Sequence, residues 1–282
     1  MITFHGKIRN GAPGNITSSE VDIYQCRDCG TIWHLPIHES AASYDSDSYR
    51  ESMGETVDLS SFYEIHDSEI LDKFTYTGTS IYRNRLFMDI GVGGGGYADY
   101  VRGVATDVVL IEPNKHFAEL LLKKGYEVYS YGENALEKYR GKIEVLTSFD
   151  VIEHVDNPQQ FLQTAYDLLA PNGTAFIGTP TEYPVIRSLL GEKFEAFVFS
   201  VQHLWVFSKS SLDIMAKKAG FTNIEVKFYQ RFGLGNLIAW LSEVKPKGDA
   251  MYNFITPSLN ALYKSEMSRE ETAEYLVLEV RK

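Results

Sequence analysis

Short apolar runs recur from the middle of the chain to its end, and segments with helical spacing separate most of them. Apolar runs of about four to eight residues bounded by turn residues predict strands, whereas longer segments with one apolar face predict helices. The predicted strands are Leu86–Ile90, Asp107–Glu112, Tyr126–Tyr131, Ile143–Ser148, Thr174–Thr179, Phe221–Tyr229 and Tyr275–Val280. Strands that alternate with helices indicate an α/β fold.

Helix boundaries support this alternation. The pattern of residues Lys115–Lys124 predicts a helix that Gly125 ends. A second helix is predicted to start at Asp156-Asn157-Pro158, which combines a capping side chain with a proline in the first turn. Pro171-Asn172-Gly173 stops that second helix. The apolar stripe of 62–74 predicts a further helix before the first strand.

The most informative stretch is the glycine turn, residues 91–96, which follows the first strand. Glycine lets the backbone bend with positive φ and lets a ligand approach where a Cβ would collide. The turn therefore predicts the binding of a nucleotide-like cofactor. Its glycines also satisfy G-x-G-x-x-G, but that pattern alone is a weak indication of a dinucleotide.

Two acids narrow the choice of cofactor. Asp89, two residues before Gly91, is a carboxylate at the end of a buried strand, where it needs a cationic or donating partner. The ammonium group of S-adenosylmethionine fits this requirement. Glu112 ends the second strand, where an acid commonly accepts the hydroxyls of a ribose. NAD and S-adenosylmethionine both carry that ribose, so Glu112 does not choose between them.

The stretch Ser148-Phe149-Asp150-Val151-Ile152-Glu153-His154-Val155-Asp156-Asn157-Pro158 completes a set of three motifs. With Asp89-Ile-Gly-Val-Gly-Gly-Gly and Ile111-Glu112-Pro113, it resembles the class I S-adenosylmethionine-dependent methyltransferases over roughly residues 60–230. The chain is similar to the branch that includes ubiquinone-pathway O-methyltransferases and many sugar or natural-product methyltransferases.

This resemblance implies a Rossmann-like seven-stranded sheet of order 3-2-1-4-5-7-6 with helices on both faces. We expect an N-terminal knuckle and lead-in segment at 1–60 and a methyltransferase domain at 61–282, with a possible cap at 231–272. The helix at 62–74, or the tyrosine-bearing turn before it, would form part of a lid. An ordinary packing helix explains that segment equally well.

The resemblance also assigns cofactor contacts. Ser148 and Phe149 would lie beside the methionine part, because strands one and four flank the point where strand order reverses. Glu133 and Asn134 fall where the family contacts adenine, although a helix cap explains Asn134 as well. The expected cofactor-binding residues are Asp89, Gly91, Val92, Gly93, Glu112, Pro113, Glu133, Asn134, Ser148 and Phe149.

Methyl transfer from a sulfonium needs a protein base only when the acceptor must lose a proton. His154 is the first candidate, and Glu153 would orient it or act alone. A histidine that ties the turn to its neighbours is the alternative. Asp150, Glu153 and His154 are spaced to share one face of a helical turn, so a divalent cation there is an open question.

The N-terminal segment carries the two cysteines of the chain, Cys26 and Cys29. C-x-x-C-G forms a knuckle that can hold one side of a zinc ion, with His34 and His38, or His5, as the remaining ligands. A packed knuckle without metal is the other interpretation. Glycine and proline in residues 1–20 favour irregular structure.

Composition then limits the partners. The formal net charge is −11, which disfavours nucleic acid as a substrate and favours a small molecule. No apolar run reaches the length of a membrane helix, the N-terminus does not resemble a signal peptide, and cysteines are few, so we expect a cytoplasmic location. Oligomeric state, acceptor and methylated atom do not follow from the sequence.

The leading hypothesis is thus a small-molecule methyltransferase, with an oxygen of a sugar-like or other metabolite as acceptor. An NAD-dependent oxidoreductase is the alternative enzyme, which Asp89 and the 150–155 motif disfavour. A cofactor-binding scaffold without catalysis is the third hypothesis.

Overall fold

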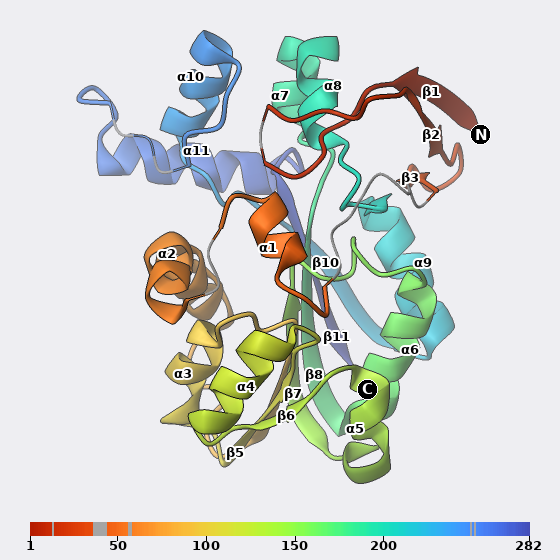
Figure 1. The fold of residues 1–282 in the computed structure, drawn as a ribbon, viewed down its shortest axis with the longest axis vertical. Helices are drawn as coiled ribbons and strands as arrows, with labels where there is room; N and C mark the ends of the chain where they lie inside the picture. Colours follow the sequence, from red (N-terminus) through yellow and green to blue (C-terminus); the bar gives the residue numbers. More distant parts are fainter. Residues whose placement is uncertain (13, 36–43, 56–57, 249, 251) are drawn as a thin grey trace. The chain divides into compact units, whose positions relative to one another are not determined.

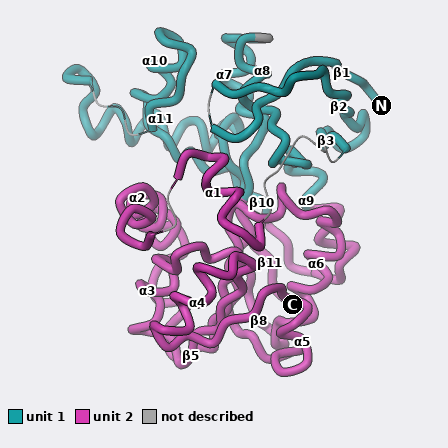
Figure 2. Tube along the Cα trace, viewed as in Figure 1, with its two compact units in different colours: residues 1–40, 179–212, 226–277 teal, residues 41–178, 213–225, 278–282 magenta. Residues whose placement is uncertain are grey.

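The computed structural model of the chain describes residues 1–282 apart from 13, 36–43, 56–57, 249 and 251. The chain forms two compact units (Figure 2). Unit 1 comprises residues 1–40, 179–212 and 226–277, and unit 2 comprises residues 41–178, 213–225 and 278–282. The domain boundary expected between residues 60 and 61 stays a prediction.

A seven-stranded sheet is the centre of the fold (Figure 1). Its strands are β4 (Leu86–Ile90), β5 (Asp107–Ile111), β6 (Glu127–Tyr129), β7 (Ile143–Phe149), β8 (Leu169–Pro180), β10 (Asn223–Tyr229) and β11 (Tyr275–Arg281). The spatial order is β10-β11-β8-β7-β4-β5-β6. Counted along the chain, this is the order 3-2-1-4-5-7-6, so the predicted fold class is confirmed.

Helices precede or connect these strands. The helices are α1 (Ser48–Ser52), α2 (Leu59–Thr77), α3 (Gly96–Arg102), α4 (Lys115–Lys123), α5 (Gly132–Tyr139), α6 (Pro158–Leu168), α7 (Pro184–Leu190), α8 (Glu192–Val198), α9 (Lys209–Ala219), α10 (Leu234–Glu243) and α11 (Pro257–Arg269). In unit 2, α2 and α3 lie to one side of the strands and α5 and α6 to the other (Figure 1). Fully buried Phe87, Phe117 and Val145 belong to the core that α2, α3 and α4 cover.

The register of the parallel strands brings the predicted motifs to one edge. Ile90 at the end of β4 is level with Ile111 of β5 and with Ser148 of β7. The residues that follow these three strands therefore meet at the carboxyl edge of the sheet, where open α/β sheets bind ligands.

Unit 1 holds a small sheet of order β1-β2-β3-β9, with β1 (Ile2–Gly6), β2 (Val21–Gln25), β3 (Ile32–His34) and β9 (Trp205–Val206). The expectation of irregular structure throughout residues 1–20 is wrong over β1. That strand pairs with β2 in antiparallel register, from Ile2 opposite Gln25 to Gly6 opposite Val21. The partner strand satisfies its backbone groups, a tertiary effect that a local reading of the glycines and Pro13 misses.

The expected insertion at 231–272 contains α10 and α11. Across the described part of the chain, the helices are too short or too polar for any of them to cross a membrane.

Candidate functional site

The glycine turn lies between β4 and α3 in a conformation that requires glycine. Gly91, Gly93 and Gly95 have φ of 79°, 54° and 80°. The Gly91 N–H donates to the Ile111 carbonyl at 2.8 Å, which holds the turn against the end of β5. A Cβ on Gly91 would lie 2.3 Å from a methyl group of Val151. The turn therefore has no room for side chains. A backbone that must approach a ligand closely also has to lack them.

Helix α2 covers this turn. The Tyr63 hydroxyl donates to the Gly94 carbonyl at 3.1 Å. A Cβ on Gly94 would lie 2.6 Å from the ring of Phe62, and one on Gly96 would lie 2.6 Å from Ile70. The helix expected at 62–74 is thus present and packs on the glycine turn, which agrees with both of its expected roles, lid and packing helix.

Asp89 is buried one strand position before the end of β4, with 5% of its surface exposed. The Thr147 hydroxyl of β7 donates to its Oδ1 at 2.6 Å. Burial raises the pKa of Asp89 to about 7, although the Thr147 hydrogen bond and the nearby charge of Lys73 oppose that rise. Near neutral pH, a cationic ligand would therefore favour the ionised form of this carboxyl.

Glu112 joins the glycine turn to the end of β5. Its Oε2 accepts the Gly93 N–H at 2.6 Å and its Oε1 accepts the Asn114 N–H at 2.8 Å. Burial raises its pKa to about 7, while the two backbone donors and the charge of Arg50 work in the opposite direction. Each carboxylate oxygen has a second lone pair, so the side chain can still accept ligand hydroxyls.

The first two motifs also contain Val92 and Pro113. Val92 is buried, and its N–H approaches the Ile111 carbonyl at 3.4 Å. Pro113 is half-buried between Glu112 and Asn114, whose side chain caps α4 through the Phe117 N–H.

At the end of β7, the Ser148 hydroxyl is buried and donates to the Ile90 carbonyl at 3.1 Å. The ring of Phe149 lies 5.8 Å from that of Tyr97. Asp150 has φ of 59°, and its carboxylate pairs with Lys73 at 2.7 Å. The expectation that Asp150 lies on one helical face with Glu153 and His154 is not met, because Asp150 leaves β7 in a left-handed conformation.

Glu133 and Asn134 lie in the first turn of α5. Asn134 accepts the Tyr131 N–H at 3.1 Å, which is a helix-capping contact. Glu133 accepts the Thr164 hydroxyl at 3.0 Å. Both side chains therefore have structural partners, and their role toward adenine stays a prediction.

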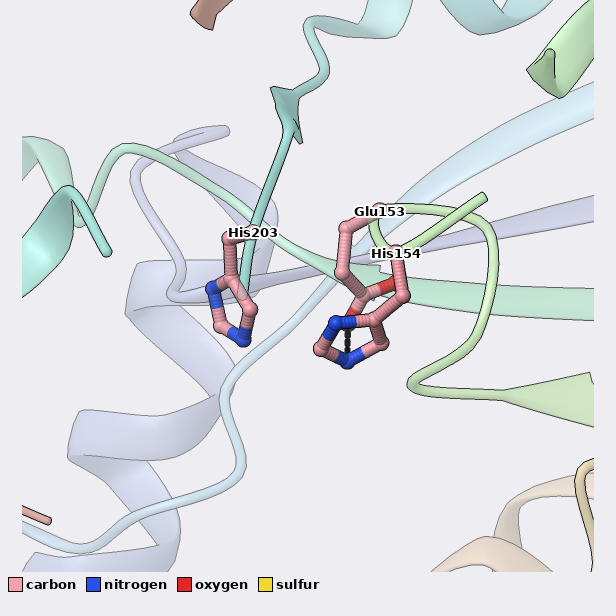
Figure 3. A group of neighbouring side chains, drawn as sticks. All are labelled: Glu153, His154 and His203. Atoms are coloured by element: carbon pink, nitrogen blue, oxygen red, sulfur yellow. Dashed lines mark ion pairs between the residues drawn. The ribbon is translucent and has the colours of Figure 1, made fainter. Parts of the chain in front are cut away.

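Glu153 and His154 follow β7 in a short turn, and Figure 3 draws both together with His203, which belongs to unit 1. The Glu153 carboxylate is 1% exposed and lies 3.9 Å from Nε2 of His154. The Tyr44 hydroxyl contacts Nδ1 of His154 at 2.8 Å, and the ring of Tyr49 packs edge-on against the imidazole. In the tautomer whose Nδ1–H donates to the Tyr44 oxygen, Nε2 carries the lone pair at which His154 would take up a proton.

Four residues of this site, Tyr44, Arg50, Lys73 and Thr147, were not expected from the sequence. Tyr44 and Arg50 lie in the Ser-, Asp-, Glu- and Tyr-rich lead-in segment, and Lys73 lies in α2 between the apolar residues Leu71 and Phe74. Thr147 is a polar residue inside an apolar strand, directly opposite Asp89. A buried threonine in such a strand is the one signal that indicates a polar partner on the neighbouring strand.

The predicted zinc ligands in unit 1 do not form a set. Cys26 and Cys29 are half-exposed, and the Gly30 N–H donates to the Cys26 carbonyl at 3.0 Å, as in a knuckle. His34 is buried with its ring nitrogens 2.8 Å and 2.9 Å from the carbonyls of Leu35 and Ser200. His5 contacts Asp22. Within the described residues neither histidine joins the cysteines, and His38 lies outside those residues.

Comparison with known proteins identifies the family to which this chain belongs. A family model described as a methyltransferase domain matches residues 63–226. The ubiquinone biosynthesis O-methyltransferase of Caulobacter vibrioides is 33% identical over 100 residues, which is 33% of this chain and 39% of the relative. The mitochondrial enzyme of the same description from Rattus norvegicus is 28% identical over 132 residues, or 42% of this chain and 38% of the relative. The match thus spans less than half the length of these relatives.

Solved structures agree on the fold. A SAM-dependent methyltransferase from Archaeoglobus fulgidus aligns with a TM-score of 0.51 at 14% identity, covering 78% of this chain and 98% of that one. A SAM-dependent methyltransferase from Thermotoga maritima, described as a possible histamine N-methyltransferase, aligns with a TM-score of 0.52 at 18% identity and covers 78% of this chain and 92% of that one.

Proposed function

This chain belongs to the methyltransferase domain family, and we propose that it transfers a methyl group from S-adenosylmethionine to a small molecule, with an oxygen of a sugar-like or other metabolite as acceptor. The single observation that carries the proposal is the glycine turn with Asp89 and Glu112 beside it. A dinucleotide-binding strand normally has an apolar residue where Asp89 stands, so the carboxyl favours a cationic cofactor over NAD.

The residues of unit 2 fit this cofactor. The backbone of the glycine turn is bare of side chains, and a Cβ on Gly91 would have no space. Asp89 would balance the positive charge of the bound cofactor, and Glu112 would accept the ribose hydroxyls. S-adenosylmethionine supplies an electrophilic methyl group that needs no further activation.

The protein then contributes alignment, exclusion of water and a proton acceptor. S-adenosylmethionine would supply the methyl group to the acceptor oxygen, and the hydroxyl proton of the acceptor would then have to leave. His154 takes that proton at Nε2, while Tyr44 holds Nδ1 at 2.8 Å and the Glu153 carboxylate stabilises the imidazolium from 3.9 Å. The cytoplasmic location and the absence of nucleic acid among the substrates stay predictions.

A transfer assay tests the proposal. The full chain is incubated with S-adenosylmethionine carrying a labelled methyl group and a panel of hydroxylated metabolites, sugars and catechols among them. Label in at least one product, and its loss in Asp89→Ala, supports the proposal. Tight cofactor binding without transfer to any acceptor favours the scaffold hypothesis, and binding of NADH alone refutes the proposal.

A further inference from the structure

The two cysteines of the chain lie in one tight turn of unit 1, between β2 and β3. The Cys26 N–H donates to the Thr31 carbonyl at 2.9 Å, and the Gly30 N–H donates to the Cys26 carbonyl at 3.0 Å. Gly30 has φ of 76°, which lets the chain turn back into β3. Because β2 and β3 also pair with each other, both ends of the turn are held, and the backbone keeps Cys26 and Cys29 close together.

The hydrogen bonds to the two sulfur atoms differ. Sγ of Cys26 accepts the backbone N–H groups of Cys29 and Asp28, and the Cys29 thiol also donates to it. Sγ of Cys29 lies 3.2 Å from the Thr31 hydroxyl. Hydrogen-bond donors favour the anionic form of the atom that accepts them, and the thiolate is the form of cysteine that attacks other sulfur atoms. Cys26 is therefore the better nucleophile, and the second thiol already contacts it.

The sulfur atoms are accessible although the turn is fixed. Both cysteines are half-exposed. The Ser208 hydroxyl donates to the Cys29 carbonyl, and a Cβ on Gly30 would lie 3.6 Å from the Cβ of Ser208. Ser208 thus holds the end of the turn that carries Cys29. A small molecule in solution can reach the sulfur atoms without any opening of the core of unit 1.

Metal binding is the competing role for such a pair, and a tetrahedral zinc site needs two further ligands. His34 directs its ring nitrogens at the carbonyls of Leu35 and Ser200. His5 contacts Asp22, so in the described part of the chain neither histidine joins the cysteines. Where cysteines of an enzyme in a reducing compartment do not bind a metal, thiol–disulfide chemistry is their usual role.

We propose that Cys26 and Cys29 form a reversible disulfide by exchange with a small disulfide of the glutathione type, a modification that is separate from methyl transfer. The Cys26 thiolate attacks one sulfur of glutathione disulfide, and the first glutathione leaves as a thiolate with the electron pair of the broken bond. The Cys29 thiolate then attacks Sγ of Cys26 and expels the second glutathione. The two cysteines lose two protons and two electrons, and one glutathione disulfide becomes two thiols. An excess of reduced glutathione reverses both steps.

Mass spectrometry of the full chain after incubation with glutathione disulfide tests this exchange. The wild type should lose two hydrogen atoms, keep no glutathione and return to its original mass in reduced glutathione. Cys29→Ser should keep one glutathione on Cys26, because no second thiol expels it. The double variant Cys26→Ser/Cys29→Ser is the control for other modifications, and its mass should not change.

The two single variants also test whether the folded turn makes the cysteines different. Under native conditions at neutral pH, Cys29→Ser should react with glutathione disulfide at least about tenfold faster than Cys26→Ser, because only Sγ of Cys26 accepts backbone donors. In concentrated urea the two rates should become equal, because the turn is lost.

Three results would overturn the proposal. They are a wild type that keeps its mass or retains glutathione, equal or reversed native rates for the single variants, and stoichiometric zinc in the purified chain that Cys26→Ser removes. The wild-type result does not depend on the folding of any variant. None of these results bears on the proposed function, which the methyl-transfer assay tests separately.

Discussion

Gly91→Ala is expected to destabilise the chain through two separable costs. The first is backbone strain, because Gly91 has φ of 79°, a conformation that costs an alanine about 1–2 kcal/mol. The second is a collision, because the new methyl group would lie 2.3 Å from Cγ2 of Val151. Overpacking of this kind costs about 1–3 kcal/mol. The expected loss in the free energy of unfolding is therefore about 2–5 kcal/mol.

Gly141→Ala separates these costs. Gly141 also has positive φ, 69°, but a Cβ there would meet nothing within 4 Å. Its alanine variant should lose about 1–2 kcal/mol from strain alone. In the Gly91→Ala background, the added change Val151→Ala removes the colliding methyl groups and should recover the second cost, so the two changes are not additive.

Urea unfolding of the wild type, the two glycine variants, Val151→Ala and the double variant measures these values, and titration with S-adenosylhomocysteine gives the matching affinities. Gly91→Ala should also weaken the ligand, whereas Gly141→Ala should not. Equal destabilisation by the two glycine variants, or no recovery on adding Val151→Ala, would refute the steric reasoning about the turn.

The other predictions concern the acids and the proposed base. Burial raises the pKa of Asp89 and Glu112 to about 7, above unfolded values near 4, so the folded state binds more protons and the stability of the ligand-free chain should fall as pH rises from about 4 to about 7. Thermal melts should show that fall, and Asp89→Asn should reduce it. Thr147→Val removes the 2.6 Å hydrogen bond to Asp89 and should weaken S-adenosylmethionine by about tenfold or more, measured by calorimetry. His154→Gln should keep affinity for S-adenosylhomocysteine and lose about a hundredfold or more in kcat; unchanged turnover would exclude it as the base. Tyr44→Phe should shift the pH profile of kcat while leaving KM for the cofactor unchanged.

Much of the sheet follows from sequence because its signals are local. The apolar runs, the glycine turn and the helix cap at Asn157 each depend on neighbouring residues, and the strand order follows from resemblance. The sequence does not predict the strand β1, because that strand depends on pairing with β2 and not on the turn residues of its own segment.

The site was predicted less completely for the same reason. Asp89 and Glu112 are visible as acids at strand ends, but the hydroxyl of Thr147 reaches Asp89 only through the register of β4 and β7. The predicted face shared by Asp150 and Glu153 fails because the left-handed turn directs Asp150 toward Lys73. Arg50 lies in a polar segment without periodicity, so its packing against the glycine turn is a tertiary result.

The measurement that tests the account most directly is calorimetric titration of the chain with S-adenosylmethionine, and separately with NADH, for the wild type and Asp89→Ala. We expect saturable one-to-one binding of S-adenosylmethionine that Asp89→Ala abolishes, and no binding of NADH. Binding of NADH alone, or S-adenosylmethionine affinity that is the same without the Asp89 carboxyl, would contradict it.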